Sequence, residues 1–261
     1  MTPTPIVDAS HYVRDAPTAE LSKSVGQPYS FKFLYFPIHA AGSCSRELLG
    51  YGKDKFAFEI LSPANWGEEK PKTPFHCMPV LYIKTKDGKD LVLSEASVIE
   101  HYLAKHMNLL GDNEYEELLI KSFHSSSTMF QGGFASNVTW CPPEVQPQTL
   151  AYFKANTFPT WIKTHTKHLL DNGDNGHYIG NKLSLADIRT ANAIEHLSVQ
   201  PCADELMDII KKAPSLMKVR ETVANDPKIA AWRASKEYQT LTSNSKAFFL
   251  NPMKFMGPPK I

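Results

Sequence analysis

The sequence predicts an α/β domain followed by an all-helical domain. Short apolar and aromatic runs of the strand type are concentrated between residues 31 and 94, and a helix-length segment separates the first two of them. From Glu114 onward the strand signals stop and apolar residues recur with helical spacing. With 261 residues, the chain is long enough for two modest domains that each have a core.

The first domain begins, in this interpretation, at Phe31. The run FKFLYF predicts a buried strand, SCSRELLGYG a helix that ends at its glycines, and FAFEIL a second strand. A helix between two strands favours a right-handed parallel β-α-β unit. VLYIKT and DLVL follow as strands around Asp87-Gly88, which indicates a hairpin. A helix over SEASVIEHYLAKH closes the domain, with Ser94 as its N-cap.

The second domain contains five successive helix candidates, and the third of them opens with the capping box Ser184-x-x-Asp187. The first meets Gly132-Gly133 and then Pro142-Pro143, so we expect it to bend or stop there. We expect an irregular N-terminal extension (1–30), an α/β domain (31–107), an all-helical domain (114–237) and a C-terminal tail (238–261).

Charge and composition exclude several classes of function. Lysine and arginine (28) nearly balance aspartate and glutamate (27), which argues against a nucleic-acid partner. The apolar runs fall short of the roughly 20 residues of a membrane-spanning helix, and the N-terminus lacks the apolar core of a signal peptide. We therefore expect a cytoplasmic protein.

Metal sites and disulfides are not indicated either. The four cysteines lie far apart without a C-x-x-C pair. His165 and His168 would share a helix face, but they have no third ligand nearby in the sequence. We expect no metal.

Three parts of the sequence carry a resemblance to a known family. They are LYFPIHAAGSCSREL, NWGEEKPKTPFHCMPVL, and LSEASVIEHYLA together with YIGNKLSLADI. In this order and spacing they resemble the cytosolic glutathione transferases of the tyrosine type, and the sigma class in particular. The resemblance covers about residues 31–237. It implies a thioredoxin-like domain that binds glutathione, followed by the all-helical domain, and a homodimer.

The resemblance also implies the site. Tyr35 would be the catalytic tyrosine and Arg46 a recurrent helix arginine. Pro79 would follow a cis peptide bond, which lets the backbone of Met78 pair with the cysteinyl part of glutathione. Glu95 would meet the ligand's ammonium group, at a helix start that favours its α-carboxylate. The implied glutathione-binding positions are Tyr35, Trp66, Lys70, Cys77, Met78, Pro79, Glu95, Ala96 and Ser97.

The sequence departs from the family pattern at three of its positions. Ala96 stands where the family usually has serine or threonine, and Cys77 stands where a glutamine is common. Ser125 stands at the aspartate that reaches the neighbouring subunit's ligand. These departures suit a dedicated pathway enzyme.

Tyr35 competes with other polar side chains in the same segment. A phenol that donates a hydrogen bond to the glutathione sulfur could lower the pKa of the thiol by roughly two units. Counted from Tyr35, the loop positions that other transferase classes use are His39, Ala40 and Ala41. Ser43 is then interpreted as a helix N-cap and Cys44 as a buried, inert thiol.

An apolar pocket for the second substrate is expected near His39, Met129, Phe130 and Phe134. The aromatic tail AFFLNPMKFMGPP is expected to cover this pocket or a groove between subunits.

Three functions fit these observations. The leading one is a glutathione transferase that acts on an apolar electrophile. The first alternative is a glutathione-dependent cis-trans isomerase of a conjugated alkene in a secondary-metabolite pathway, as in some fungal proteins that resemble this family. The second is a non-catalytic member that binds a ligand or regulates.

Overall fold

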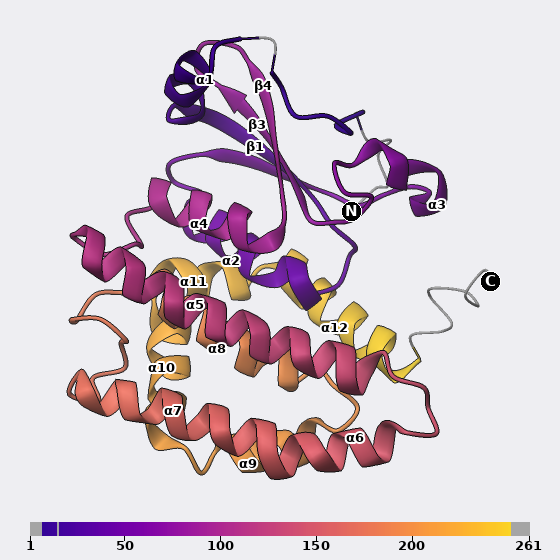
Figure 1. The fold of residues 1–261 in the computed structure, drawn as a ribbon, viewed down its shortest axis with the longest axis vertical. Helices are drawn as coiled ribbons and strands as arrows, with labels where there is room; N and C mark the ends of the chain where they lie inside the picture. The colour runs from indigo at the N-terminus through magenta and orange to yellow at the C-terminus, as the bar shows by residue number, and fades with distance from the viewer. Residues whose placement is uncertain (1–6, 15, 252–261) are drawn as a thin grey trace. The chain divides into compact units, whose positions relative to one another are not determined.

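The computed structural model of the protein describes residues 7–14 and 16–251. The chain divides into two compact units, Met1–Leu103 and Ala104–Ile261. We call them the sheet unit and the helical unit (Figure 1).

The sheet unit contains a four-stranded sheet with the order β2-β1-β3-β4. Its strands are β1 (Pro28–Leu34), β2 (Ala57–Leu61), β3 (Val80–Thr85) and β4 (Asp90–Ser94). β1 and β2 are parallel and are connected through α2 (Ser43–Tyr51), whereas β3 pairs antiparallel with both β1 and β4. The predicted β-α-β unit and hairpin are therefore confirmed. In Figure 1, α2 and α4 (Ala96–His106) lie below the sheet.

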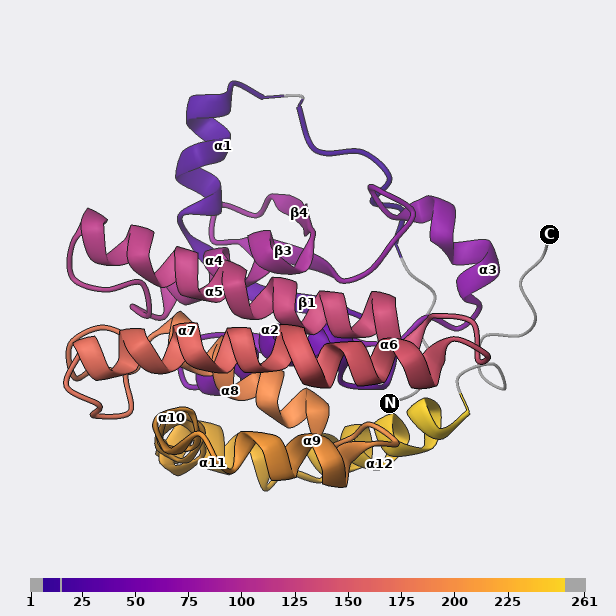
Figure 2. The same cartoon turned by 60° about the horizontal axis from the view of Figure 1, so that its bottom comes forward.

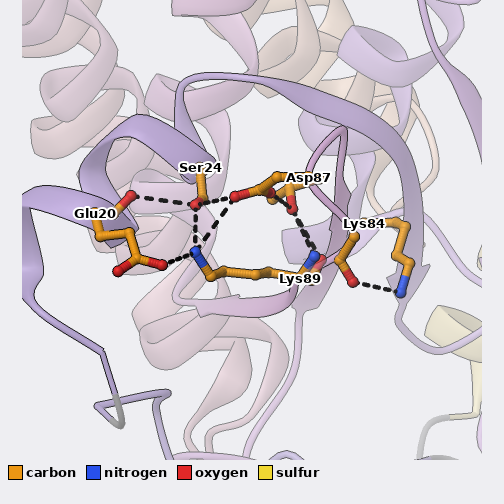
Figure 3. Close-up of polar contacts among 7 residues, drawn as sticks. Glu20, Ser24, Lys84, Asp87 and Lys89 are labelled. Carbon is orange, nitrogen blue, oxygen red and sulfur yellow. Dashed lines mark hydrogen bonds and ion pairs between the residues drawn. The ribbon is translucent and has the colours of Figure 1, made fainter.

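The extension before the sheet contains a helix that the sequence analysis did not expect. Residues Thr18–Val25 form α1, and β1 begins at Pro28 rather than at Phe31. The Ser24 hydroxyl donates to Asp87 in the hairpin at 2.7 Å, and the Lys89 ammonium donates to Glu20 at 2.5 Å (Figure 3). These partners lie more than 60 residues away in the chain, so local sequence patterns do not reveal them.

The start of α2 also differs from the prediction. Gly42, and not Ser43, is the N-cap residue, because Ser43 already has helical backbone angles and its hydroxyl donates to the Ala40 carbonyl at 2.9 Å. A short 3-10 turn (Ala40–Gly42) precedes the helix and shifts its first turn. Cys44 is fully buried, as predicted.

The helical unit begins with α5 (Glu114–Phe134), which continues without interruption into a π-helical turn (Ala135–Thr139). The Gly132-Gly133 pair therefore does not stop the helix, which ends shortly before Pro142. The remaining elements follow in chain order: α6 (Gln146–Tyr152), a second π-helical turn (Phe153–Thr157), α7 (Phe158–Asp171), α8 (Leu185–Leu197), α9 (Ala203–Ile210), α10 (Pro214–Asn225), α11 (Pro227–Arg233) and α12 (Lys236–Leu250).

The core of the helical unit surrounds α8, which is buried over almost its whole length. Figures 1 and 2 show α5 beside the continuous α6–α7 helix. Phe130 of α5 stacks on Trp161 of α7 with the ring centroids 4.2 Å apart. Both ring nitrogens of the nearby His165 have partners, the hydroxyls of Ser126 and Tyr178. This histidine is part of a buried hydrogen-bond network between helices.

α12 extends through much of the segment expected to be a tail, and the tail residues 252–261 lie outside the described residues. Within residues 7–14 and 16–251, no helix has the length and apolar character needed to cross a membrane.

Candidate functional site

The register of the sheet brings three predicted site residues together at one end of the strands. Leu34 at the end of β1 pairs with Val80 at the start of β3, and Val80 pairs with Ser94 at the end of β4. Tyr35, Pro79 and Glu95 are the next residues at this end on three neighbouring strands. Because strands lie about 4.8 Å apart, this row spans about 10 Å. An extended tripeptide has a similar length, roughly 10 Å.

Tyr35 is held with its hydroxyl against the loop that follows it. The side chain is 7% exposed, and its hydroxyl accepts a hydrogen bond from the backbone N–H of Ala41 at 3.2 Å. Burial raises the pKa of Tyr35, although the charge of Arg46 and the Ala41 N–H act in the opposite direction. The phenol therefore keeps its proton at neutral pH, and a hydroxyl that accepts from Ala41 can still donate this proton to a second group.

Arg46 fixes the same loop from inside the protein. It is 1% exposed, and its guanidinium donates to the carbonyls of Ile38 at 2.6 Å and Phe36 at 2.5 Å. The guanidinium carbon also lies 5.3 Å from the centroid of the Tyr35 ring. Hydrogen bonds from a charged group are stronger than those between neutral groups, so Arg46 positions both the loop and the ring.

Gly42 lies directly against the Tyr35 ring, a contact that the sequence does not reveal. A Cβ on Gly42 would lie 2.5 Å from Cδ1 and 2.6 Å from Cγ of Tyr35. Real Cβ atoms do not approach carbon atoms so closely, and an aromatic ring cannot bend away. A glycine that follows a loop of small residues is a weak sequence signal for such a contact, because only the fold shows that the Tyr35 ring lies beside it.

We expect Gly42→Ala to displace the Tyr35 ring. Overpacking of this kind costs about 1–3 kcal/mol, so the urea midpoint of unfolding should fall. The matched control is Gly132→Ala, since a Cβ on Gly132 meets nothing within 4 Å and alanine favours helix by up to about 1 kcal/mol. If circular dichroism in urea gave equal midpoints for Gly42→Ala and the wild type, the ring would not be confined as described.

Trp66 and Lys70 lie on the β2 side of the row. Trp66 begins the short helix α3 (Trp66–Glu69), and the Phe36 ring separates it from Tyr35 with centroid distances of 5.8 Å to each ring. Lys70 follows at the end of α3 and is exposed. An exposed cation beside an indole can bind a carboxylate.

Cys77 and Glu95 lie together beyond Pro79. The Cys77 thiol is 3.6 Å from a carboxylate oxygen of Glu95. Burial and then the charge of Glu95 raise the pKa of Cys77, so this thiol stays protonated and is not a nucleophile at neutral pH. The peptide bond between Met78 and Pro79 is cis, and the Met78 side chain packs against a small apolar cluster that includes Leu34.

Glu95 has an uncommon backbone conformation. Its φ is +73°, a value that favours glycine, and its side chain is exposed. Residues in such conformations often occur at functional sites. Ala96 and Ser97 follow in the first turn of α4 and are half-buried. A carboxylate next to the N–H groups of a helix start can bind the ammonium and carboxylate groups of an amino acid.

The residues expected near the second substrate belong to both units. His39 is buried in the sheet unit. In the helical unit, Met129 is 74% exposed, Phe130 is buried among aromatic rings, and Ser125 is exposed on α5. Phe134 lines a cavity of about 560 Å³ in that unit.

This cavity has the size of a small-molecule site. Its wall combines aromatic side chains, two thiols and several polar groups, among them Phe134, Trp140, Cys141, Gln200, Cys202 and Phe249. Phe134 was expected at an apolar pocket, and Phe249 belongs to the segment AFFLNPMKFMGPP that was expected to cover this pocket or a groove between subunits. The residues named besides Phe134 come from three separate segments of the chain, which only the packing of the helices brings together.

Comparison with known proteins gives consistent results. Residues 134–236 match the family model described as "Glutathione S-transferase, C-terminal domain". A probable glutathione S-transferase 6 of Caenorhabditis elegans is 23% identical over 76% of this chain and 97% of its own length. The hematopoietic prostaglandin D synthase of Rattus norvegicus is 26% identical over 78% of this chain and 94% of its own length.

Solved structures agree with these relatives. The structure of prostaglandin synthase D of Nilaparvata lugens has a TM-score of 0.67 and 26% identity, and the match covers 79% of this chain and 98% of that one. A sigma class transferase of Fasciola hepatica has a TM-score of 0.67 at 22% identity, over 80% and 98% of the two chains, which shows the fold alone. The resemblance and the fold class expected from the sequence are thereby confirmed.

Proposed function

From the premise that this chain is a homologue of the glutathione S-transferases and has their fold, we propose that it activates the thiol of glutathione for attack on an electrophilic small molecule. One observation carries the proposal: the protonated phenol of Tyr35 stands in a row with Pro79 and Glu95 at one end of three neighbouring strands.

The chemistry requires a stabilised thiolate. A free cysteine thiol has a pKa near 8.5, so it is mostly protonated at neutral pH. When its proton leaves to solvent, the Tyr35 hydroxyl donates a hydrogen bond to the sulfur anion, and the pKa of the thiol falls. The thiolate then forms a sulfur-carbon bond with a conjugated electrophile. The π bond of the attacked alkene breaks, its electron pair moves onto the conjugated group, and the adduct takes up a proton from solvent. Tyr35 keeps its own proton throughout, which agrees with its raised pKa.

The remaining residues hold the tripeptide. Glu95 and the first turn of α4, with Ala96 and Ser97, bind the γ-glutamyl end. The backbone of Met78 pairs with the cysteinyl part, and Trp66 and Lys70 bind the glycine carboxylate. Cys77 borders the ligand as a neutral thiol.

The second substrate is largely apolar in this proposal. The support is the cavity of about 560 Å³ in the helical unit, whose wall includes Phe134, Trp140 and Phe249. The chain is further proposed to be a cytoplasmic homodimer, as the family resemblance implies. Light scattering coupled to size-exclusion chromatography tests the dimer.

The isomerase remains the alternative enzymatic function, since the same thiolate can add reversibly to a conjugated alkene and leave after rotation. The test is to incubate the protein with glutathione and a panel of conjugated electrophiles. Consumption of glutathione supports the transferase, and isomerised product without consumption supports the isomerase. Absence of both turnover reactions across the panel supports a binding or regulatory protein and contradicts the proposal.

A further inference from the structure

Residues 7–14 run beside the segment that leads into β3. The backbone N–H of Ala9 donates to the carbonyl of Lys72 at 2.8 Å, and Ala9 itself is buried. The hydroxyl of Tyr82, on β3, donates to the carbonyl of Val7 at 3.2 Å. The extension is therefore attached to the same segment that carries Cys77, Met78 and Pro79.

Tyr12 lies where this extension approaches the site. Its ring meets the ring of Phe75 edge to face, with the centroids 6.1 Å apart. Partial burial, the Glu95 carboxylate and Cys77 all raise the pKa of Tyr12, and Glu95 in turn accepts the hydrogen bond from the Cys77 thiol. The phenol of Tyr12 is thus protonated, a hydrogen-bond donor, and close enough to Glu95 to be influenced by its charge.

The other end of the extension is also anchored. In addition to the Glu20 and Ser24 contacts of α1 with the hairpin (Figure 3), the Tyr102 hydroxyl donates to the carbonyl of Val25 at 2.9 Å. The residues just before Tyr12 and the helix α1 after it are each held by contacts with the sheet unit, and contacts made from a pre-organised part of the chain can contribute to affinity.

We propose that residues 7–12 form a wall of the glutathione site beside Glu95, and that the Tyr12 hydroxyl donates a hydrogen bond to the α-carboxylate at the γ-glutamyl end. This inference rests on the proposed function. Its chemistry follows from the pair of groups on an amino acid: Glu95 binds the ammonium, and the adjacent carboxylate needs donors, which Tyr12 and the first turn of α4 supply.

The test is calorimetry of glutathione binding to the full-length wild type, Tyr12→Phe and Tyr12→Ala. Removal of a hydrogen bond to a charged group lowers affinity roughly 10-fold or more, so Tyr12→Phe should raise the Kd for glutathione by about 10-fold. Tyr12→Ala should raise it at least as much. The KM for glutathione should rise with kcat nearly unchanged, because Tyr35 is untouched. γ-Glutamylcysteine, which has the same end, should lose affinity by the same factor.

The matched control is Tyr29→Ala, because Tyr29 is 66% exposed and lies at the far end of β1, about 20 Å along the strand from Tyr35. It should bind glutathione as the wild type does. Unchanged Kd in Tyr12→Phe overturns the hydrogen bond, and unchanged Kd in both Tyr12 variants overturns the wall while the proposed function stands. A wild type that binds no glutathione overturns the proposed function and this inference together.

Discussion

Tyr35→Phe is expected to lower kcat/KM for glutathione conjugation about 10- to 100-fold at neutral pH. The substitution removes only the hydroxyl, so the ring keeps its contacts with Gly42 and Arg46. The lost interaction is a hydrogen bond to a sulfur anion, worth about 1.5–3 kcal/mol. The measurement is initial rates with the best electrophile of the panel.

The pH dependence identifies the cause. Without the Tyr35 hydroxyl the thiolate is less stable, so the pKa of bound glutathione should rise towards about 8.5, the value of a free cysteine thiol. The rate of Tyr35→Phe should then increase with pH and approach that of the wild type above this pKa. Tyr29→Phe is the control and should behave as the wild type. Equal rates for Tyr35→Phe and the wild type at pH 6.5 would contradict the proposed role, since thiolate is scarcest there.

Asp187→Ala is expected to lower the stability of the helical unit by about 4 kcal/mol. Asp187 is fully buried at the start of α8, and its carboxylate accepts hydrogen bonds from the Ser184 N–H and hydroxyl at 2.8 and 2.9 Å and from the Tyr178 N–H at 2.8 Å. Alanine leaves two buried N–H groups without this acceptor, and each costs about 1–3 kcal/mol.

This loss should appear as a lower midpoint of urea unfolding, monitored by far-ultraviolet circular dichroism. The control is Asp208→Ala, because Asp208 is exposed and pairs only at the surface with Lys211. Surface pairs contribute at most about 1 kcal/mol, so its midpoint should change little. Similar midpoints for the two variants would mean that the capping box does not stabilise α8 as its geometry indicates.

The capping box and the sheet show which features are readable in a sequence. Ser184 and Asp187 stand three residues apart, and the hairpin signal Asp87-Gly88 is a dipeptide. Both structures form within a few residues, so the residue types that they require stand close together in the sequence. For the same reason the helix-strand alternation at the start of the sheet unit predicted its parallel pair correctly.

Features that depend on distant partners were missed. α1 is held by hydrogen bonds of its Glu20 and Ser24 with Lys89 and Asp87, which lie more than 60 residues further along the chain. The eight residues of α1 do not indicate these partners. The pair Gly132-Gly133, followed by Pro142-Pro143, predicted a bend or stop, yet α5 continues through the glycines and packs against α8 and, through Phe130 and Trp161, against α7. Tertiary contacts outweigh the cost of about 1 kcal/mol for a glycine in a helix.

The sequence alone determined the order of the four strands, the capping box and the family resemblance, because these follow from short-range patterns. Only the tertiary structure decided that the Tyr35 ring fits against Gly42, that Ala9 pairs with the segment before β3, and which side chains line the cavity in the helical unit. Such contacts join residues that the fold brings together, and their distances are set by packing rather than by position in the chain.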